Sequence, residues 1–171
     1  MEMWERCLIG FMPTFLIVWA VKRWPWIDSF EKEVAMIKAT LGKEIVIKRL
    51  NEIGALADIV KIIAEKGVSI LAISAWVEGP DGVFRFLVDD ELRAADALRA
   101  KNYNVREGQV VLAEVPHKPG MLRLLTEKMK GAGIDLHHLY ASAALDQTKC
   151  LVVFSSADNQ KAMVVLNQTA H

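Results

Sequence analysis

The pattern of hydrophobic positions occurs twice along the chain. Apolar residues recur at a helical spacing of three and four after Gly54, and they take matching positions after Gly120. In each copy a second glycine, Gly67 or Gly133, ends the helix. A short apolar, β-branched segment follows, which predicts a strand. The chain is therefore predicted to be a tandem duplication of a unit that has the size of a small domain.

The predicted strand of each copy changes phase part-way along its length. The inward positions are 68, 70 and 73 in the first copy, and 134, 136 and 139 in the second. Such a shift places two successive residues opposite one residue of the neighbouring strand. It therefore predicts a β-bulge in both strands.

Turn and capping residues define the remaining elements. The first copy is predicted to contain strands over residues 44–50, 68–76, 83–88 and 104–107, with helices between 54 and 67 and over 91–101. The second is predicted to contain strands over 109–115, 134–143 and 149–154 and helices over 120–131 and 158–167, without a clear fourth strand. This order, βαββαβ, predicts an α+β fold of two ferredoxin-like units whose helices cover one face of antiparallel sheets. We place the domains at residues 44–108 and 109–171, after an N-terminal extension of residues 1–43.

Composition narrows the class of protein. A hydrophobic content of 53% supports a packed core, and 21 basic residues balance 21 acidic ones. A chain without net charge has no overall field to attract nucleic acid, so no nucleic-acid partner is expected. The two cysteines, Cys7 and Cys150, lie in unlike segments. We therefore expect no disulfide framework and a reducing, cytoplasmic location.

Residues 1–26 have a composition unlike the rest of the chain. They contain four of the five tryptophans and an apolar run from Cys7 to Val21 that includes Pro13. A membrane-spanning helix needs about 20 apolar residues, so this run is too short to span a bilayer. Three interpretations stay open: translation that starts at Met36, an interfacial membrane anchor formed by residues 1–26, and an extra helix docked on the domains.

The sequence offers little support for catalysis or for a metal site. His117, His137, His138 and Cys150 are the candidate ligands, but they lack the close spacing that zinc sites use. Cys150 lies in an apolar strand, where a buried cysteine is usually inert. We therefore expect no metal, no cofactor and no enzymatic activity.

Several segments resemble one family. The helix starts after Asn51-x-x-Gly54 and Pro116-His-Lys-Pro-Gly120-x-Leu122, and the phrases KGVSILAIS and AGIDLHHLYA, are similar to those of ACT domains. The doubled arrangement over residues 44–166 resembles the small stand-alone tandem ACT proteins. The resemblance implies a regulatory, non-enzymatic protein that binds an amino acid at the interface between two such domains.

The starts of the two helices are the predicted ligand site. Backbone N–H groups there have no helical partner and carry the positive end of the helix dipole, which favours a carboxylate. Glycine at 54 and 120 leaves the approach open, although it also serves a plain turn. We expect the N–H groups of residues 121 and 122 to hold the carboxylate. The first loop has Ile53 where the family usually has proline, so we expect that loop to be looser than the second.

Each predicted crevice joins the loop of one domain to the second strand of its neighbour. One crevice is formed by Gly120, Met121 and Leu122 with Ile73, Ser74 and Ala75, and His117 adds charge beside it. The reciprocal crevice is formed by Asn51, Gly54, Ala55 and Leu56 with Leu139, Tyr140 and Ala141.

The sequence thus predicts a regulatory amino-acid-binding protein. A homo-oligomer is expected to form through exposed edge strands, which we place at the second strand of each copy. Pairing there between domains or between chains would give a continuous sheet. The alternative is an assembly module, membrane-tethered or soluble, that binds no small molecule.

Overall fold

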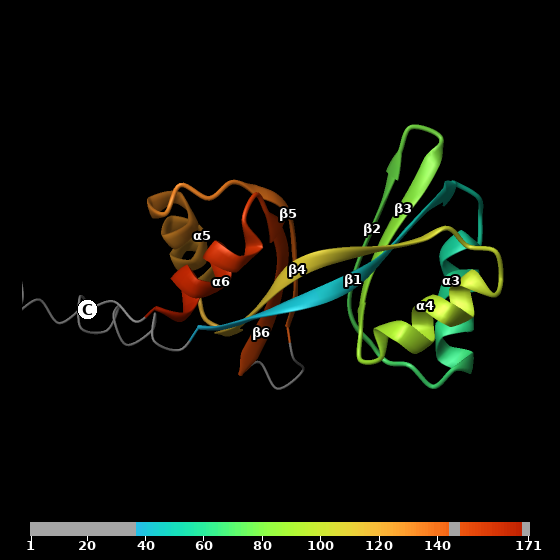
Figure 1. Cartoon of the computed structure of the whole chain (residues 1–171), viewed down its shortest axis with the longest axis horizontal. Coiled ribbons are helices and arrows are strands. Elements are labelled where there is room, and N and C mark those ends of the chain that lie inside the picture. Colours follow the sequence, from blue (N-terminus) through green and yellow to red (C-terminus); the bar gives the residue numbers. More distant parts are fainter. Residues whose placement is uncertain (1–36, 144–147, 169–171) are drawn as a thin grey trace, which may run out of the picture.

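Six antiparallel strands and four helices make up the part of the chain that the computed structural model describes, residues 37–143 and 148–168 (Figure 1). In chain order the elements are β1 (Lys38–Leu50), α3 (Ala55–Glu65), β2 (Ile70–Glu78), β3 (Asp81–Val88), α4 (Glu91–Arg99), β4 (Val105–Pro116), α5 (Met121–Gly131), β5 (Leu136–Ala143), β6 (Lys149–Ser156) and α6 (Asn159–Asn167). The strands form one sheet in the order β2-β3-β1-β4-β6-β5. The predicted α+β fold of two ferredoxin-like repeats is confirmed.

The long strands β1 and β4 are each shared by both repeats. The second half of β1 pairs with β3 from Ile45 to Leu50, whereas its first half pairs with β4. β4 in turn pairs with β6 from Val111 to Pro116. The first unit therefore has the strand order β2-β3-β1-β4, and the second unit has the order β5-β6-β4-β1. We use "first unit" and "second unit" in this sense below.

This sharing corrects two expectations. The position of the fourth strand in the second unit is filled by the first half of β1, so the edge of β4 is paired rather than open. β1 begins at Lys38 rather than at residue 44, and the strands predicted at 104–107 and 109–115 are one continuous strand. The hydrophobic pattern is interrupted at the crossing between the units, by Gly42 and Lys43 in β1 and by Gly108 in β4. In the sequence each long strand therefore looks like two segments.

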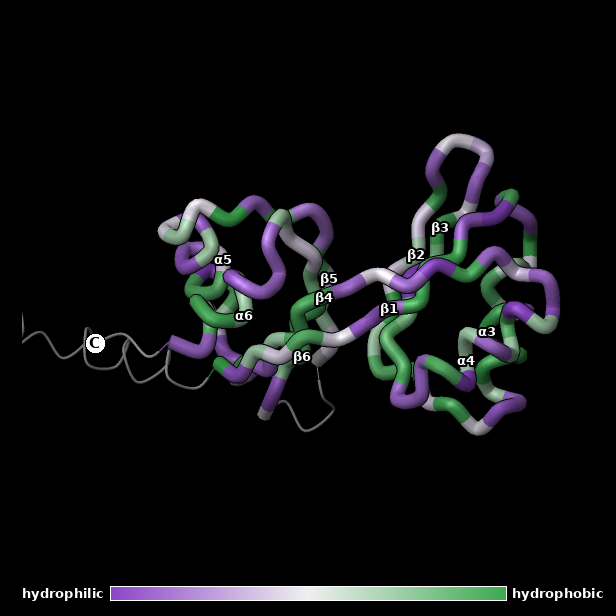
Figure 2. The backbone as a smooth tube through the Cα atoms, in the orientation of Figure 1, coloured by the Kyte–Doolittle hydropathy of each residue, from purple (hydrophilic) through white to green (hydrophobic). Residues whose placement is uncertain are grey.

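Each unit has its own hydrophobic core beneath its helices. The core of the second unit includes Ile37 and Ala39 together with Leu125 of α5 and Leu166 of α6. The core of the first unit contains residues such as Ile45, Ile59 and Phe86. Figure 2 shows hydrophobic stretches in each unit and hydrophilic residues in β1 and β4 where they cross between the units.

A third cluster of buried residues joins the two units. Its buried members come from four strands and lie on the face of the sheet that the helices leave open: Ala72, Leu87, Val110 and Val153. In Figure 1 the helices lie at the two ends of the molecule and the two halves of the sheet lie between them. The helix-free faces of the two units therefore pack against each other.

Local predictions from the sequence are confirmed in several places. The register shifts between Ile70 and Ala72 in β2 and between Leu136 and His138 in β5, where bulges were expected. The side chain of Asp90 accepts a hydrogen bond from the N–H of Arg93 and so caps α4, as its position before the helix indicates.

The interpretations of residues 1–35 lie outside the described residues. No helix in the described part of the chain is long and apolar enough to cross a membrane.

Candidate functional site

Both predicted ligand loops have the same backbone geometry. α3 and α5 each begin after a glycine in the left-handed region, with φ of 91° at Gly54 and 93° at Gly120. No side chain caps either helix. A Cβ at either glycine would meet nothing within 4 Å, so the space in front of both loops is open. Glycine is favoured at both positions by the positive φ itself, whether or not a ligand binds.

Four backbone N–H groups at these helix starts have no acceptor among the described residues: those of Leu56, Ala57, Leu122 and Arg123. The N–H of Met121 points to the carbonyl of Lys118 at 3.4 Å. The available donors in the second loop are therefore those of residues 122 and 123, one position later than expected. Ala55 and Met121 are buried, whereas the side chains of Leu56 and Leu122 are exposed beside the donors.

Each loop lies beside a hairpin of its own unit. The N–H of Asn51 donates to the carbonyl of Pro80 at 2.9 Å, which fixes the first loop next to the turn between β2 and β3. The N–H of His117 donates to the carbonyl of Thr148 at 3.1 Å, next to the strand β6 of the second unit. The side chains of Asn51 and His117 are exposed.

The strands of the predicted crevices lie in the other unit from their loops. In Figure 1 α5 lies in a different half of the molecule from β2, and α3 is likewise separated from β5. One chain therefore does not bring the Gly120 loop next to β2 or the Gly54 loop next to β5. The strand residues themselves range from half-buried to exposed: Ile73, Ser74, Ala75, Leu139, Tyr140 and Ala141.

The structure brings the second strands together differently from the edge pairing expected. β2 and β5 form the two ends of the strand order and share no ladder hydrogen bonds. They meet instead through side chains on their helix-free faces, where the rings of Trp76 and His138 lie 5.1 Å apart between centroids. Edge pairing between the two units of one chain is therefore wrong, and within the described ranges neither β2 nor β5 has a strand on its outer edge.

A polar cluster that the sequence analysis missed lies at this contact. It consists of Glu44, Trp76, Arg85, His138 and Tyr140. Glu44 is 1% exposed. Its Oε1 accepts a hydrogen bond from Nη1 of Arg85, and its Oε2 accepts one from the Tyr140 hydroxyl at 2.9 Å. The charged Arg85 in the apolar segment VFRFLV was the only local signal of this cluster.

The surroundings shift two titratable groups of the polar cluster. Burial raises the pKa of the Tyr140 phenol, and the nearby Glu44 carboxylate acts in the same direction. Burial lowers the pKa of His138, and the positive charge of Arg85 adds to this effect against the opposing carboxylate of Glu44. Both groups are therefore held in their neutral forms around pH 7.

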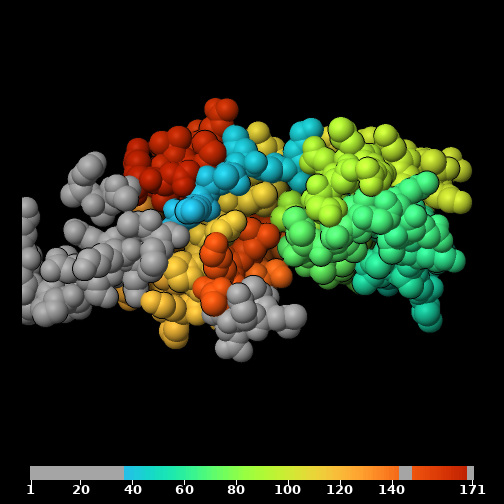
Figure 3. All heavy atoms as spheres, turned by 90° about the horizontal axis from the view of Figure 1, so that it is seen from below, coloured from blue at the N-terminus to red at the C-terminus, as the bar shows by residue number. Residues whose placement is uncertain are grey.

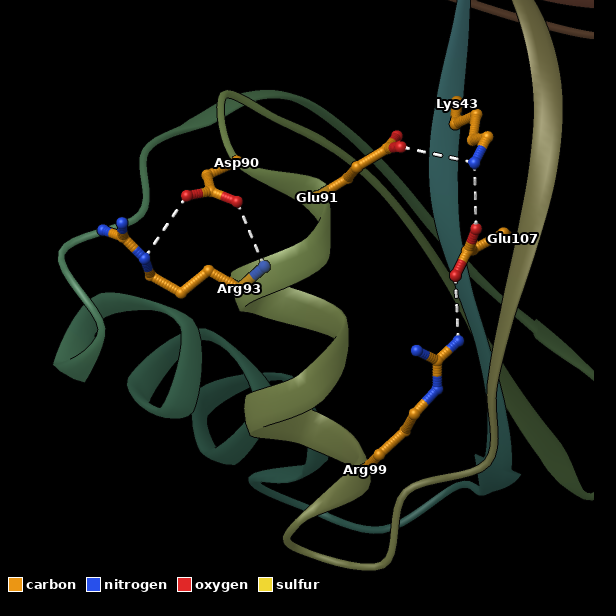
Figure 4. Close-up of polar contacts among 6 residues, drawn as sticks. All are labelled: Lys43, Asp90, Glu91, Arg93, Arg99 and Glu107. Carbon is orange, nitrogen blue, oxygen red and sulfur yellow. Dashed lines mark hydrogen bonds and ion pairs between the residues drawn. The ribbon is translucent and has the colours of Figure 1, made fainter.

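An ion-pair network lies on the opposite, helix-covered side of the crossing. Figure 4 shows Lys43 of β1 between Glu91 of α4 and Glu107 of β4, at 3.5 and 3.3 Å, with Arg99 reaching Glu107 at 2.9 Å. The pKa of Lys43 is raised mainly by its hydrogen bond to Glu107. The pKa of Glu107 is lowered mainly by the hydrogen bond that it accepts from Arg99. The network is solvent-exposed, so it holds α4 on the strands without burying charge.

The candidate metal ligands do not converge. Within the described ranges, no group of three or more histidine, cysteine or acidic residues is placed to hold a metal ion. His117 and His137 are exposed, and Cys150 is a half-buried free thiol. Nε2 of His137 lies 3.9 Å from Oδ2 of Asp135.

Comparison with known proteins identifies the first unit. The family model of the ACT domain matches residues 43–104, which run from the crossing in β1 to the residue before β4. Residues 43–104 are thus similar to the ACT domain. The second unit shares its strand and helix order, and so the chain repeats the topology of the first unit. A search of curated protein sequences finds no significant match to the chain.

Solved structures with similar folds extend the likeness to both units. The protein BT0572 from Bacteroides thetaiotaomicron is 23% identical with a TM-score of 0.69, over 75% of this chain and 88% of that one. The regulatory subunit of aspartate kinase from Thermus thermophilus is 15% identical with a TM-score of 0.56, over 78% and 97%. That from Thermus flavus is also 15% identical, with a TM-score of 0.52, over 78% and 95%. At these identities the likeness shows the fold alone, across both units.

Proposed function

We propose that this protein is a regulatory protein that binds a free amino acid at an interface formed by its ACT domain and the second unit. The carrying observation is the pair of glycine-started helices whose N–H groups at residues 56, 57, 122 and 123 lack acceptors among the described residues. The likeness in fold to regulatory subunits of aspartate kinase supports a regulatory, non-enzymatic role. We place the protein in the cytoplasm.

The chemistry of the loops suits an amino acid. Two adjacent N–H donors at the positive end of a helix dipole favour the α-carboxylate. The exposed side chains of Leu56 and Leu122 beside them offer apolar surface to a ligand side chain. The ammonium group would find acceptors in the carbonyl groups along an open strand edge.

A second copy of the chain supplies the missing half of each crevice. Among the described strands β2 has a neighbour on one side only, and this edge strand exposes large apolar side chains: Leu71, Ile73, Trp76 and Val77. An exposed apolar edge strand favours pairing with another chain. The proposed sites keep the residues inferred from the sequence, with the loops at Gly54 and Gly120 contributed by one chain and the strands by its partner. Tyr140 contributes only its backbone, because its hydroxyl is bound to Glu44.

Thermal unfolding of the full chain with each of the twenty amino acids tests the proposal. A ligand at about 100 times its dissociation constant adds about 2.7 kcal/mol to the stability of the folded state. For a domain of this size that corresponds to several degrees in the unfolding midpoint. The result expected is a rise with one amino acid or with a few related ones. No rise with any of the twenty at millimolar concentration contradicts the proposal.

The exposed apolar edge of β2 also favours a second candidate, an assembly module without a small ligand. Light scattering across protein concentrations separates the two. The assembly module predicts an oligomer that no amino acid stabilises. A monomer at micromolar concentration, with rapid amide exchange in both β2 and β5, contradicts edge pairing in either candidate.

A further inference from the structure

The polar cluster forms a direct polar connection between the two units. Glu44 lies in β1 at the crossing, and its two carboxylate oxygens are bound by groups from different units: Arg85 of β3 in the first and Tyr140 of β5 in the second. A buried carboxylate is costly unless it is paired and hydrogen-bonded, so Glu44 favours the arrangement that keeps both donors in place.

Three rings and a guanidinium group make up the rest of the polar cluster. The ring of His138 lies between Trp76, at 5.1 Å, and Tyr140, at 5.5 Å, measured between centroids. The guanidinium carbon of Arg85 lies 5.7 Å from the centre of the Trp76 ring. His138 therefore bridges a side chain of β2 and one of β5, the strands through which the two units touch.

Two buried nitrogen atoms in the cluster have no hydrogen-bond partner in the part of the chain that the structure describes: Nε of Arg85 and Nε2 of His138. A neutral imidazole tolerates this position better than a charged one, because imidazolium requires acceptors for both of its N–H groups. The groups that face His138 in the described structure are the Arg85 cation from β3, the Glu44 carboxylate from β1 and the neutral phenol of Tyr140 from its own strand. β2 contributes the uncharged Trp76. An added proton on His138 therefore lies in a buried position beside a cation.

We propose that the polar cluster is a pH-sensitive connection between the units, and that protonation of His138 separates β2 from β5. The protonated ring leaves its place against Trp76 to reach water, and the contact between the helix-free faces loosens. The connection through β1 and β4 remains, because those strands are covalently continuous through both units. The proposal concerns the join between the units and is independent of amino-acid binding.

The distance between the units is the direct measurement. Lys61 on α3 and Lys130 on α5 are exposed and lie in different units. Each is replaced by cysteine and labelled with one dye of a donor–acceptor pair. In that full-length protein Cys7 is replaced by serine and Cys150 by alanine. Energy transfer is followed from about pH 7.5 to about pH 5, the range in which a histidine changes its charge.

Two adjacent histidines give a matched comparison. His137 is exposed on the same strand, with 56% of its side chain accessible, whereas Nε2 of His138 is buried. We expect the distribution of distances to widen on acidification, with a midpoint below about 6.5, the ordinary pKa of histidine. The same widening is expected in His137→Gln and none in His138→Gln. Equal widening in His138→Gln, or no widening in the parent protein, overturns the proposal.

Tyr140→Phe provides a test that does not depend on the folding of the histidine variant. The substitution keeps the ring and removes the hydroxyl that binds Glu44. We expect a wider distribution of distances already at about pH 7.5, where His138 is neutral. A distribution as narrow as that of the parent shows that the cluster does not hold the units together and overturns the proposal.

Discussion

The side-chain amide of Asn167 pairs with the backbone of Ala39 in both directions. The N–H of Ala39 donates to Oδ1 of Asn167 at 2.9 Å, and Nδ2 of Asn167 donates to the carbonyl of Ala39 at 2.7 Å. On this side the first half of β1 has no neighbour among the described strands, because β3 pairs only from Ile45 onward. The last residue of α6 therefore takes the place of a strand at an open edge. Seen from below, α6 (red) lies against the first half of β1 (blue; Figure 3).

Replacement of Asn167 will test how much this contact stabilises the second unit. Asn167→Ala leaves both backbone groups of Ala39 without a partner in a partly buried place, at a cost of about 1–3 kcal/mol. Denaturant unfolding measures the loss. Asn104→Ala is the control, since Asn104 is exposed and a surface substitution usually stays within about 0.5 kcal/mol. If Asn167→Ala is as stable as Asn104→Ala, water binds the backbone groups of Ala39 as well as the Asn167 side chain does.

The first half of β1 is expected to be part of the second unit rather than a removable extension. A chain that begins at residue 44 loses Ile37 and Ala39 from the core and exposes the edge of β4. Loss of buried apolar side chains together with a paired strand costs several kcal/mol. We compare the denaturant midpoints of this chain, of a chain that begins at Met36 and of the full chain. We predict that the chain from Met36 is as stable as the full chain. Equal midpoints for the chains from 36 and 44 would contradict this role of β1.

Features that depend on local sequence were predictable. The helix starts, the glycine at each helix end and the bulges in β2 and β5 leave signals within a few residues. The first half of β1 left a weaker signal, because Ala39 and Leu41 alternate over a short segment that ends at Gly42. Its pairing with β4 depends on residues far along the chain, which no local pattern reveals.

The polar cluster escaped prediction for the same reason. Glu44 reads as the polar start of a strand, and its burial follows only from the arrival of Tyr140 from the other unit. The separation of the predicted loops from their strands also depends on how the two units are joined. The two helix starts lie where the sequence placed them, and their role as a ligand site stays a prediction. The identity of the ligand and the closure of each crevice stay predictions.

The pairing of Glu44 with Arg85 predicts strong coupling between these two residues. Arg85→Met leaves a buried carboxylate with the Tyr140 hydroxyl as its remaining partner, and such a loss costs about 3–5 kcal/mol. The double variant Glu44→Leu with Arg85→Met removes both charges. Its free energy of unfolding should be higher than that of Arg85→Met alone by more than about 1 kcal/mol, the size of a typical coupling energy. Lys43→Met, which changes a solvent-exposed ion pair on the helix-covered side of the same strand, is the control and should change stability little. Additive effects in denaturant unfolding would argue against a buried pair.

The Tyr140 phenol is expected to ionise at unusually high pH. Its pKa is raised by burial and by Glu44, so the folded state disfavours the phenolate. The stability that this group contributes is therefore present below about pH 10, its ordinary pKa, and is lost as the pH rises above that value. The chain has two tyrosines, so Tyr103→Phe leaves Tyr140 as the single phenol to follow by ultraviolet absorbance. We expect ionisation well above about pH 10 in the native protein and near it in denaturant. Coincident titrations would mean that Tyr140 is solvated.

The role of Gly120 in ligand binding can be separated from its role in the fold. Valine at this position would block the approach, but the φ of 93° would also strain the backbone, and a lost ligand effect could then reflect unfolding. Asparagine tolerates the left-handed region better than other residues with a side chain, so Gly120→Asn adds a Cβ while the helix start is kept. We predict that Gly120→Asn folds and loses most of the amino-acid-dependent rise in the unfolding midpoint.

Two matched variants complete that experiment. Lys118→Ala changes an exposed side chain of the same loop and should leave most of the rise. Gly54→Asn makes the same change at the first helix start, where φ is 91°, and reports whether that loop also holds ligand. The unfolding midpoint without ligand is measured for each variant, so that a loss of stability is not mistaken for a loss of binding. A folded Gly120→Asn protein that binds with unchanged affinity would place the ligand away from the start of α5, because the new side chain stands directly in the open approach to the free N–H groups.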